Sequence, residues 1–548
     1  MMHIDTRHTH VLAGWIVAAL VGLLVGFGMA RSQTDADVRK SIQIWSAAFE
    51  EVVNTYVDSV EAESFMEVGL EAMLSELDPY TTYISEDDRA TVEVLTQGRY
   101  TGVGVEVDRR GHYVVVESVV DGSKAEQHNF SIGDVITHID GEAVDTWPLN
   151  RVRGALRGDS GTTVTLSVLR MGETPATVTV ERGPVELVAV PYSGFIGGSR
   201  HGMGYVRMER FTQQSAFEVQ QAVEDLKRNA NLDGLVLDVR DNPGGLLEAA
   251  VDVGSLFLDR GQVVVSTKGR DEGSARSYRN TNMPVYPDVP IVLLVNERSA
   301  SASEILAGAL QDHDRGVVLG QTTFGKGLVQ VIRSLPHGGS LKMTTARYYT
   351  PSGRSIHADE ASLKSRPSTT GSASFTTDAG RAVQGRNGIE PDVPIDDTYA
   401  SPLEEALLQE GAFFRFASRV AREYPRPPRG GWERDSLLAE FQAWVDAEDL
   451  SYQTQAQHAM HRIDSLVVAD HPEADAELDD LRAAIDNSTT QQFEAHADLL
   501  TARLLSEIRS RYLTSRGYYA ATLAEDEMVQ EAVSLLNDER RYVTVLNP

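Results

Sequence analysis

The sequence predicts a multidomain chain of the α/β (α+β) class, with an α/β core, an inserted β-rich module and helical regions at both ends. Apolar strand-like runs alternate with amphipathic helical patterns over residues 184–400, which is typical of a largely parallel sheet covered by helices. Short alternating strands between glycine turns mark residues 98–183, and charged helical patterns follow residue 401. A chain of 548 residues is too long for one core. It divides into five segments: 1–33, 34–97, 98–183, 184–400 and 401–548.

Composition limits the partners of the chain. The formal net charge of −30 argues against nucleic acid and against a strongly anionic membrane surface. Cysteine is absent, so neither a disulfide framework nor a cysteine-based metal site can form. His458, His461 and His496 are scattered over polar helical patterns. We therefore expect no metal and no organic cofactor.

An apolar segment, Val11–Ala30, lies near the start of the sequence and is about as long as a membrane-spanning helix. Its last residues, Gly28-Met29-Ala30, also fit a signal-peptide cleavage site, so a signal anchor, favoured by length, competes with a cleaved signal peptide. Both interpretations predict a protein of the bacterial cell envelope, anchored and facing the periplasm or extracytoplasmic space, or secreted there. Apolar residues in the segment 34–97 recur at the spacing of a helix, and we find no candidate catalytic residues there.

Residues 98–183 contain a glycine-rich loop and a characteristic order of short elements. These are Y-T-G-V-G-V-E-V at Tyr100–Val107, S-I-G-D-V-I-T-H-I-D-G-E-A-V at Ser131–Val144 and L-R-G-D-S-G-T at Leu156–Thr162. In this order they resemble a PDZ domain, whereas a lone G-x-G is more commonly an ordinary hairpin. The resemblance implies that a peptide adds as a strand to the sheet edge. Its terminal carboxylate would then meet backbone N–H groups of Gly102, Val103, Gly104 and Val105.

A second glycine loop, D-V-R-D-N-P-G-G-L-L at Asp238–Leu247, follows a buried strand-like run and precedes a helical pattern. Proline and paired glycines leave backbone N–H groups free beside a helix N-terminus, which suits an anion or an oxyanion. A phosphate-binding loop would need G-x-x-x-x-G-K-[ST], and that spacing is absent. An ordinary tight turn stays open as the alternative.

The stretch Asn296–Gln330 contains S-A-S-A-S-E-I and then T-F-G-K-G-L-V-Q, after the strand-like run Ile291–Val295. A serine where a strand gives way to a helix, followed by a lysine between glycines, suggests a Ser/Lys nucleophilic site. The sequence alone does not separate the three candidate nucleophiles Ser299, Ser301 and Ser303. His313 and His337 are the histidine alternatives for the base, but neither lies in a recognisable triad motif.

Together these motifs resemble the carboxyl-terminal processing peptidases, also called tail-specific proteases, over about Gln43–Asp396. The resemblance implies an α/β Ser/Lys protease core with an inserted PDZ domain. It also implies that Ser301 is the nucleophile, that Lys326 is the general base and that Gln330 orients the lysine.

The resemblance further implies an oxyanion hole and two supporting residues. The hole would combine the N–H of Ala302 with a glycine N–H of the N-P-G-G loop, with Gly244 preferred and Gly245 open. Asp312 matches an acidic position that supports the site in some members. Arg157, in the L-R-G element, matches an arginine linked to gating by the PDZ domain.

Two segments depart from the family pattern. Residues 359–387 are rich in serine, threonine and glycine and are predicted to form an exposed, mobile insertion. The charged helical tail from Ser401 lies outside the core motifs. Both leave substrate choice and assembly open.

The expected function is that of a serine endopeptidase of the carboxyl-terminal processing type, acting on exported or unfolded proteins near their C-termini, with the PDZ domain capturing the substrate tail. Expected partners are a protein or peptide with a free C-terminus and, through the N-terminal segment, the membrane. A homo-oligomer or an adaptor protein is left open. One rival is a non-catalytic PDZ adaptor on a protease-like scaffold, which the intact serine, lysine and glutamine disfavour. The other is a Ser/His esterase or amidase, whose G-x-S-x-G elbow is missing.

Overall fold

The structure is a computed structural model. It describes residues 36–85, 98–120, 122–170, 175–197, 202–358, 374–385, 387–395, 402–448, 459–460, 462–463, 475–513 and 515–547. The chain divides into two compact units, Met1–Tyr83 and Ile84–Pro548. The apolar segment that we interpret as an anchor or signal peptide lies outside the described residues. Within these ranges, no helix combines the length and the apolar character that crossing a membrane requires.

The described part of the first unit contains two helices that pack through aromatic side chains. One helix spans residues 36–55 and the other is α2 (Ala62–Ser75). The rings of Phe49 and Phe65 stack with centroids 5.8 Å apart. Glu61 caps α2, because its carboxylate accepts the N–H of Ser64 at 2.7 Å. Strand β1 (Thr82–Ile84) follows.

The centre of the second unit is a sheet whose strands lie side by side in chain order. Only β10 and β11 are antiparallel, and every later pair is parallel. The strands are β10 (Tyr192–Phe195), β11 (Met203–Arg207), β12 (Gly234–Asp238), β15 (Ile291–Val295), β16 (Val317–Gly320) and β21 (Val393–Pro394). The predicted α/β core is therefore confirmed.

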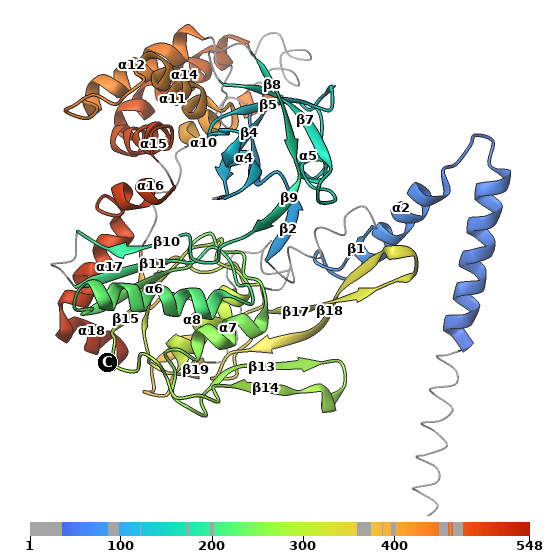
Figure 1. Ribbon diagram of the computed structural model, residues 1–548, viewed down its shortest axis with the longest axis horizontal. Coiled ribbons are helices and arrows are strands. Elements are labelled where there is room, and N and C mark those ends of the chain that lie inside the picture. The colour runs from blue at the N-terminus through green and yellow to red at the C-terminus, as the bar shows by residue number, and fades with distance from the viewer. Residues whose placement is uncertain are drawn as a thin grey trace, which may run out of the picture. The chain divides into compact units, whose positions relative to one another are not determined.

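Both faces of this sheet are buried, because alternate residues of each strand enter two different cores. Leu235 and Leu293 lie in the core beneath the helices α6 (Ser215–Asn229), α7 (Leu247–Gly254) and α8 (Ala302–Asp312). Val236 and Leu294 point to the other face, where α17 (Glu527–Asn537) and α18 (Glu539–Leu546) cover them. Figure 1 shows α17 and α18 beside the sheet. Part of the helical tail thus completes the core.

The inserted β-rich module has its own apolar core and is joined to the rest by a two-stranded ribbon. Its sheet contains β3 (Val105–Arg110), β4 (Tyr113–Val119), β5 (Val135–Ile139), β6 (Glu142–Ala143), β7 (Thr163–Leu169) and β8 (Ala176–Glu181). Its helices are α4 (Lys124–Gln127) and α5 (Leu149–Leu156), and the ribbon is β2 (Arg99–Gly102) with β9 (Gly183–Glu186). Strand β3 lies at the edge of the sheet, so it can accept an added strand.

Further strands and turns lie in the chain between strands of the central sheet, and one of these strands follows the loop that contains Lys326. The strands β17 (Leu328–Ser334), β18 (Ser340–Tyr349), β13 (Val263–Gly269) and β14 (Arg276–Arg279) pair antiparallel. Short 3-10 turns lie at Glu272–Ser274 and Pro336–Gly338. A hairpin of β19 (Ser374–Thr376) and β20 (Ala382–Gln384) follows.

This hairpin lies within residues 359–387, which the sequence predicted to be an exposed, mobile insertion. The hairpin is not wholly exposed, because Arg381 is buried and its guanidinium pairs with Asp314 at 2.7 Å and with Asp392. Residues 359–373 lie outside the described residues. Serine and threonine content alone does not reveal such ion pairs.

The remaining C-terminal helices form a separate apolar cluster. They are α10 (Pro402–Gln409), α11 (Ala412–Glu423), α12 (Arg434–Ala447), α14 (Asp475–Ala495) and α15 (Ala497–Arg509). Phe414 of α11 packs against Val115 and Val135 of the β-rich module. Helix α16 (Ser515–Thr522) then leads to α17.

Candidate active site

Ser301 lies at a strained junction between strand β15 and helix α8. It is the N-cap of α8 with φ 56° and ψ −109°. A non-glycine residue in such a conformation costs on the order of 1–3 kcal/mol and persists only where the surroundings impose it. The turn places the residue at the helix N-terminus, where the first N–H groups lack helical acceptors.

The structure separates the three candidate serines by burial and hydrogen bonding. Ser299 is fully buried and its hydroxyl donates to the carbonyl of Val239 at 2.8 Å. Ser303 is also fully buried and donates to the carbonyl of Asn242 at 2.9 Å. Ser301 is partly exposed. The outer two hydroxyls therefore hold the backbone, and Ser301 is the serine that a substrate can reach.

One buried carboxylate joins the serine and lysine segments. Glu304 Oε2 accepts the backbone N–H of Ser301 at 2.7 Å and that of Lys326 at 2.9 Å. Its Oε1 accepts Gly325 N–H at 2.7 Å and the hydroxyl of Thr323 at 2.6 Å. Because the backbone nitrogens of Ser301 and Lys326 both donate to Glu304 Oε2, the two nitrogens must lie close together. Glu304 thus brings the proposed nucleophile and base to one place.

Two effects act in opposite directions on the pKa of the Glu304 carboxyl group. Burial raises the pKa of the Glu304 carboxyl, while the four hydrogen bonds that it accepts oppose that rise. A sequence signal for this residue exists, because S-x-x-E at a helix start is a capping-box pattern. The pattern marks Glu304 as a helix cap, but it does not reveal that the same carboxylate also binds the N–H of Lys326, which lies on a distant segment.

Tyr348 of strand β18 makes a second link between the same two segments. Its hydroxyl contacts the carbonyl oxygen of Ser301 at 3.1 Å and also the carbonyl oxygen of Lys326. The ring is buried. No local pattern marks this tyrosine, since its partners lie on other elements.

The loop that carries Lys326 is closely packed because of its glycines. Gly325 has φ +86°, and a Cβ at Gly327 would lie 2.7 Å from the backbone nitrogen of His357. Only glycine therefore allows this approach. Lys326 itself is partly exposed. Gln330 lies on β17 directly after an irregularity in its pairing with β18.

The second glycine loop meets the start of helix α8. Gly244 has φ +98°, and a Cβ there would lie 2.8 Å from the backbone nitrogen of Ala302 and 2.9 Å from Ser301 Cβ. The N–H of Gly244 already donates to Asn242 Oδ1 at 2.9 Å. Over the described ranges, neither Ala302 N–H nor Gly245 N–H has a hydrogen-bond acceptor. The geometry therefore favours Gly245 over Gly244 as the partner of Ala302.

Three other residues named from the sequence lie away from this junction. Asp312 ends helix α8, the opposite end from Ser301, and pairs with buried Arg354 at 2.8 Å. His313 follows it, and its ring nitrogens contact Asp378 at 2.7 Å and the carbonyl of Val263 at 2.8 Å. His337 lies in a turn between β17 and β18. The structure brings neither histidine to Ser301.

A buried ion-pair cluster lies at the start of the second glycine loop. The Asp238 carboxylate is fully buried and accepts from Arg240 Nη2 at 2.6 Å, Arg207 Nη1 at 2.9 Å and the hydroxyl of Tyr205 at 2.6 Å. Burial alone would raise the pKa of Asp238, but Arg240 and Arg207 lower it overall. The charged cluster holds the strand end from which the loop departs.

The residues expected to bind peptide lie between β2 and the edge strand β3. Gly102 ends β2, and Gly104, with φ +90°, would bring a Cβ to 2.1 Å from Ser123 Cβ. The guanidinium of Arg157 lies 5.1 Å from the ring centroid of Tyr100. Beside them, Glu106 of β3 pairs with Arg210 of the core at 3.2 Å. The module thus contacts the core directly.

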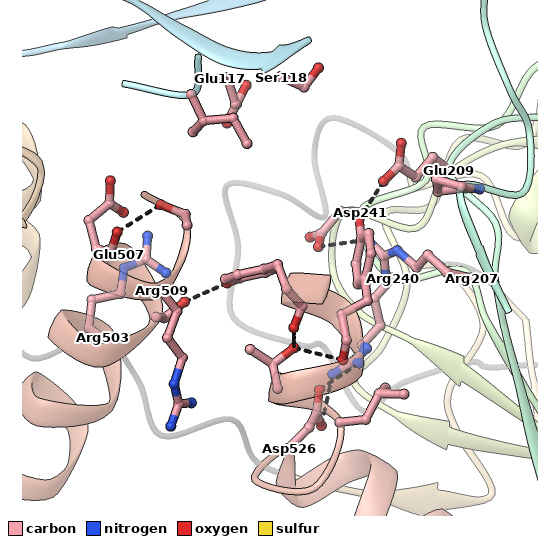
Figure 2. Close-up of a pocket in the computed structure, with 18 of the residues that line it drawn as sticks. Glu117, Ser118, Arg207, Glu209, Arg240, Asp241, Arg503, Glu507, Arg509 and Asp526 are labelled. Atoms are coloured by element: carbon pink, nitrogen blue, oxygen red, sulfur yellow. Dashed lines mark hydrogen bonds and ion pairs between the residues drawn. The ribbon is translucent and has the colours of Figure 1, made fainter. Parts of the chain in front are cut away.

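A cavity of about 1710 Å³ lies within the second unit and reaches the second glycine loop at Gly244 and Gly245. Glu117 and Ser118 of the β-rich module line it, and so do Arg503 and Glu507 of α15 (Figure 2). The cavity is therefore bounded by all three parts of this unit. Among the described residues, no cluster of histidine and acidic side chains could hold a metal ion.

Three parts of the chain match known protein families. Residues 101–181 match the PDZ domain and residues 202–362 match peptidase family S41. Residues 403–536 match the family described as "Probable PDZ-protease, C-terminal helical domain".

Similar proteins carry names that agree with these matches. The chain is 36% identical over 335 residues to a carboxy-terminal-processing protease of Bartonella bacilliformis, covering 60% of this chain and 76% of that protein. It is 32% identical over 348 residues to a probable CtpA-like serine protease of Staphylococcus haemolyticus, covering 63% and 68%. A solved structure of a photosystem II D1 C-terminal processing protease is 30% identical, with 64% of this chain and 86% of that chain covered and a TM-score of 0.38.

Proposed function

The chain belongs to the family of carboxy-terminal-processing proteases, and on that premise we propose that it is a serine endopeptidase that cleaves proteins near their C-termini, with Ser301 as nucleophile and Lys326 as general base. The observation that carries the assignment is the Glu304 carboxylate, whose Oε2 holds the backbone N–H groups of both residues. A nucleophile and its base must lie within reach of one another, and this buried contact keeps their backbones together.

In the proposed reaction, the hydroxyl of Ser301 attacks the scissile carbonyl while the neutral amine of Lys326 removes its proton. We assign the oxyanion to the N–H groups of Ala302 and Gly245, since both lack an acceptor over the described ranges. Ala302 directly follows Ser301, and Gly245 directly follows Gly244, where a Cβ would lie 2.9 Å from Ser301 Cβ. The lysine then gives its proton to the leaving amine, and water hydrolyses the acyl-enzyme. We assign Gln330 the orientation of the lysine, because β17 carries it four residues beyond Lys326.

The PDZ domain supplies the preference for a chain end. Strand β3 lies at an edge of its sheet, so a peptide tail can add beside it. Gly102 ends β2, Val103 and Gly104 connect the two strands, and Val105 begins β3. The ion pair between Glu106 of β3 and Arg210 connects that edge to the protease core. We assign Arg157 to the same junction, where it faces Tyr100.

The proposed place of action is the bacterial cell envelope, either tethered to the membrane and facing the periplasm or extracytoplasmic space, or released there. The support is the apolar segment Val11–Ala30. Fractionation of cells that express the full chain and a variant without residues 1–33 tests this proposal. Retention of both forms in the cytoplasm would overturn it.

The function is tested with an unfolded protein substrate, supplied with and without a free apolar C-terminal tail. We expect the wild type to cleave the tailed form faster, and Ser301→Ala and Lys326→Ala to cleave neither form. His313→Ala should retain cleavage, because its ring contacts Asp378 and Val263 rather than Ser301. Equal cleavage of both substrates would remove the role in tail capture. Loss of activity in His313→Ala with retention in Lys326→Ala would favour a Ser/His hydrolase, and an inactive wild type a PDZ adaptor.

A further inference from the structure

We propose that Asp526, the N-cap of helix α17, is a positioning residue for the peptidase reaction, because its ion pair with Arg240 holds the second glycine loop against the nucleophile. The proposal rests on the proposed function and adds a role for the C-terminal helical segment. Asp526 and Arg240 are 286 positions apart in the chain. No motif of the family core contains Asp526.

The contact between the two side chains is bidentate. Arg240 Nη1 donates to Asp526 Oδ1 at 3.2 Å and Nη2 donates to Oδ2 at 2.7 Å (Figure 2). Paired hydrogen bonds of this kind fix the plane of the guanidinium as well as its distance. Asp526 Oδ1 also accepts the N–H of Val529 at 3.0 Å, so the carboxylate is held by its own helix.

The adjacent edge of the same guanidinium, formed by Nε and Nη2, binds Asp238. Arg240 Nε lies 3.0 Å and Nη2 2.6 Å from Asp238 Oδ2, while Asp238 also pairs with Arg207. Two arginines thus share the fully buried Asp238. Each has a further acidic partner, because Asp526 pairs with Arg240 at 2.7 Å and Asp241 with Arg207 at 3.5 Å. The Arg240 side chain is only 16% exposed, so water replaces this partner poorly.

From Arg240, a short hydrogen-bonded loop leads to the reacting atoms. Asp241 N–H donates to Asn296 Oδ1 at 2.9 Å, and the carbonyl of Asn242 accepts Ala300 N–H at 3.0 Å. Gly244 then lies against the start of helix α8. These bonds transmit a shift of Arg240 to the proposed oxyanion donors. Misplacement of a catalytic group by about 1 Å can cost on the order of 100-fold in rate.

The helix that carries Asp526 is fixed on the central sheet independently of this ion pair. The hydroxyl of Tyr542 on α18 accepts Ile291 N–H at 2.9 Å and donates to the carbonyl of Ile291 at 3.0 Å. Val529 and Leu535 of α17 are fully buried in the second core of the sheet. A change at Asp526 should therefore loosen the loop and leave the helix in place.

The test uses Asp526→Asn with Asp538→Asn as the matched control. Asparagine is as good an N-cap as aspartate, so both variants keep their helices. Asp538 caps α18 by accepting the N–H of Arg541 at 3.0 Å. Helix α18 belongs to the same C-terminal helical segment as α17. We expect Asp526→Asn to lower kcat for an unfolded protein substrate roughly 10-fold, with KM within about 2-fold, because loop geometry rather than binding is affected. Asp538→Asn should keep the wild-type kcat.

A second readout follows the loop itself. Backbone amide hydrogen exchange over residues 240–245 should be faster in Asp526→Asn than in Asp538→Asn or the wild type, whereas exchange in α17 should be equal in all three. Wild-type kcat in Asp526→Asn, or an equal loss in Asp538→Asn, would overturn the proposal. An inactive wild type would instead contradict the proposed function. The exchange comparison would then still decide whether Asp526 holds the loop, and equal exchange would refute it.

Discussion

Replacement of Glu304 by glutamine tests the central feature of the candidate site. The wild-type carboxylate is fully buried and accepts four hydrogen bonds, from three backbone N–H groups and the Thr323 hydroxyl. Glutamine keeps the shape but has one acceptor oxygen and an amide group that only donates. At least one of the four donors must therefore lose its hydrogen-bond acceptor.

The contacts allow the size of the effect to be worked out. If the glutamine oxygen faces Ser301 and Lys326, its NH₂ group faces the Thr323 hydroxyl, which can rotate to accept, and Gly325 N–H, which cannot. One buried backbone N–H then stays unsatisfied, and the two retained bonds lose their charge. We expect a loss of about 2–4 kcal/mol in the free energy of unfolding. We also expect kcat to fall roughly 100-fold as the two segments separate.

Glu218→Gln is the matched control. Its carboxylate also accepts backbone N–H groups, from Ala189 at 2.8 Å and Val190 at 2.9 Å, but it lies on helix α6 away from Ser301. Urea denaturation and steady-state cleavage of an unfolded protein are measured for both variants. Glu218→Gln should keep the wild-type kcat and most of the stability, because both N–H groups donate to one oxygen, which glutamine retains. Wild-type kcat in folded Glu304→Gln would refute the positioning role of Glu304.

Three further predictions follow from exposure, backbone space and charge. Phe324 is 48% exposed beside Lys326, so Phe324→Ala should raise KM about 3- to 10-fold. Phe217 on α6 is 60% exposed, and Phe217→Ala should leave KM unchanged; equal KM values for the two variants would exclude substrate contact by Phe324. Gly244→Ala places a Cβ against the backbone N–H after Ser301 and should abolish cleavage, whereas measurable turnover would contradict the proposed oxyanion hole. The pKa of Asp238 is lowered overall, so its stabilisation is complete above its unfolded-state pKa of about 3.9 and is lost as pH falls below that value. Urea midpoints in Asp238→Asn should therefore depend less on acid pH than those of the wild type, and parallel curves would argue against this cluster.

Local patterns in the sequence were enough to predict the fold class and to find the serine and lysine segments. Strand-like runs such as Ile291–Val295 and the glycines around Lys326 carry their information within a few residues. The family match confirms the protease core and the PDZ domain. The roles of Ser301, Lys326 and Gln330 stay predictions until the variants are measured.

The sequence by itself determined which chemical groups are available, because a serine at a strand-to-helix junction and a glycine-flanked lysine are local features. Only the tertiary structure decided how they are held, since backbone hydrogen bonds between distant segments leave no periodic trace. Glu304 accepts the N–H of Lys326, which is 22 positions away in the chain. Asn242 Oδ1 accepts the N–H of Gly244, whereas the N–H of Gly245 has no acceptor over the described ranges. The ion pair of Arg240 with Asp526 spans more than half of the chain. Such contacts exist only once burial has brought the C-terminal helices onto the central sheet.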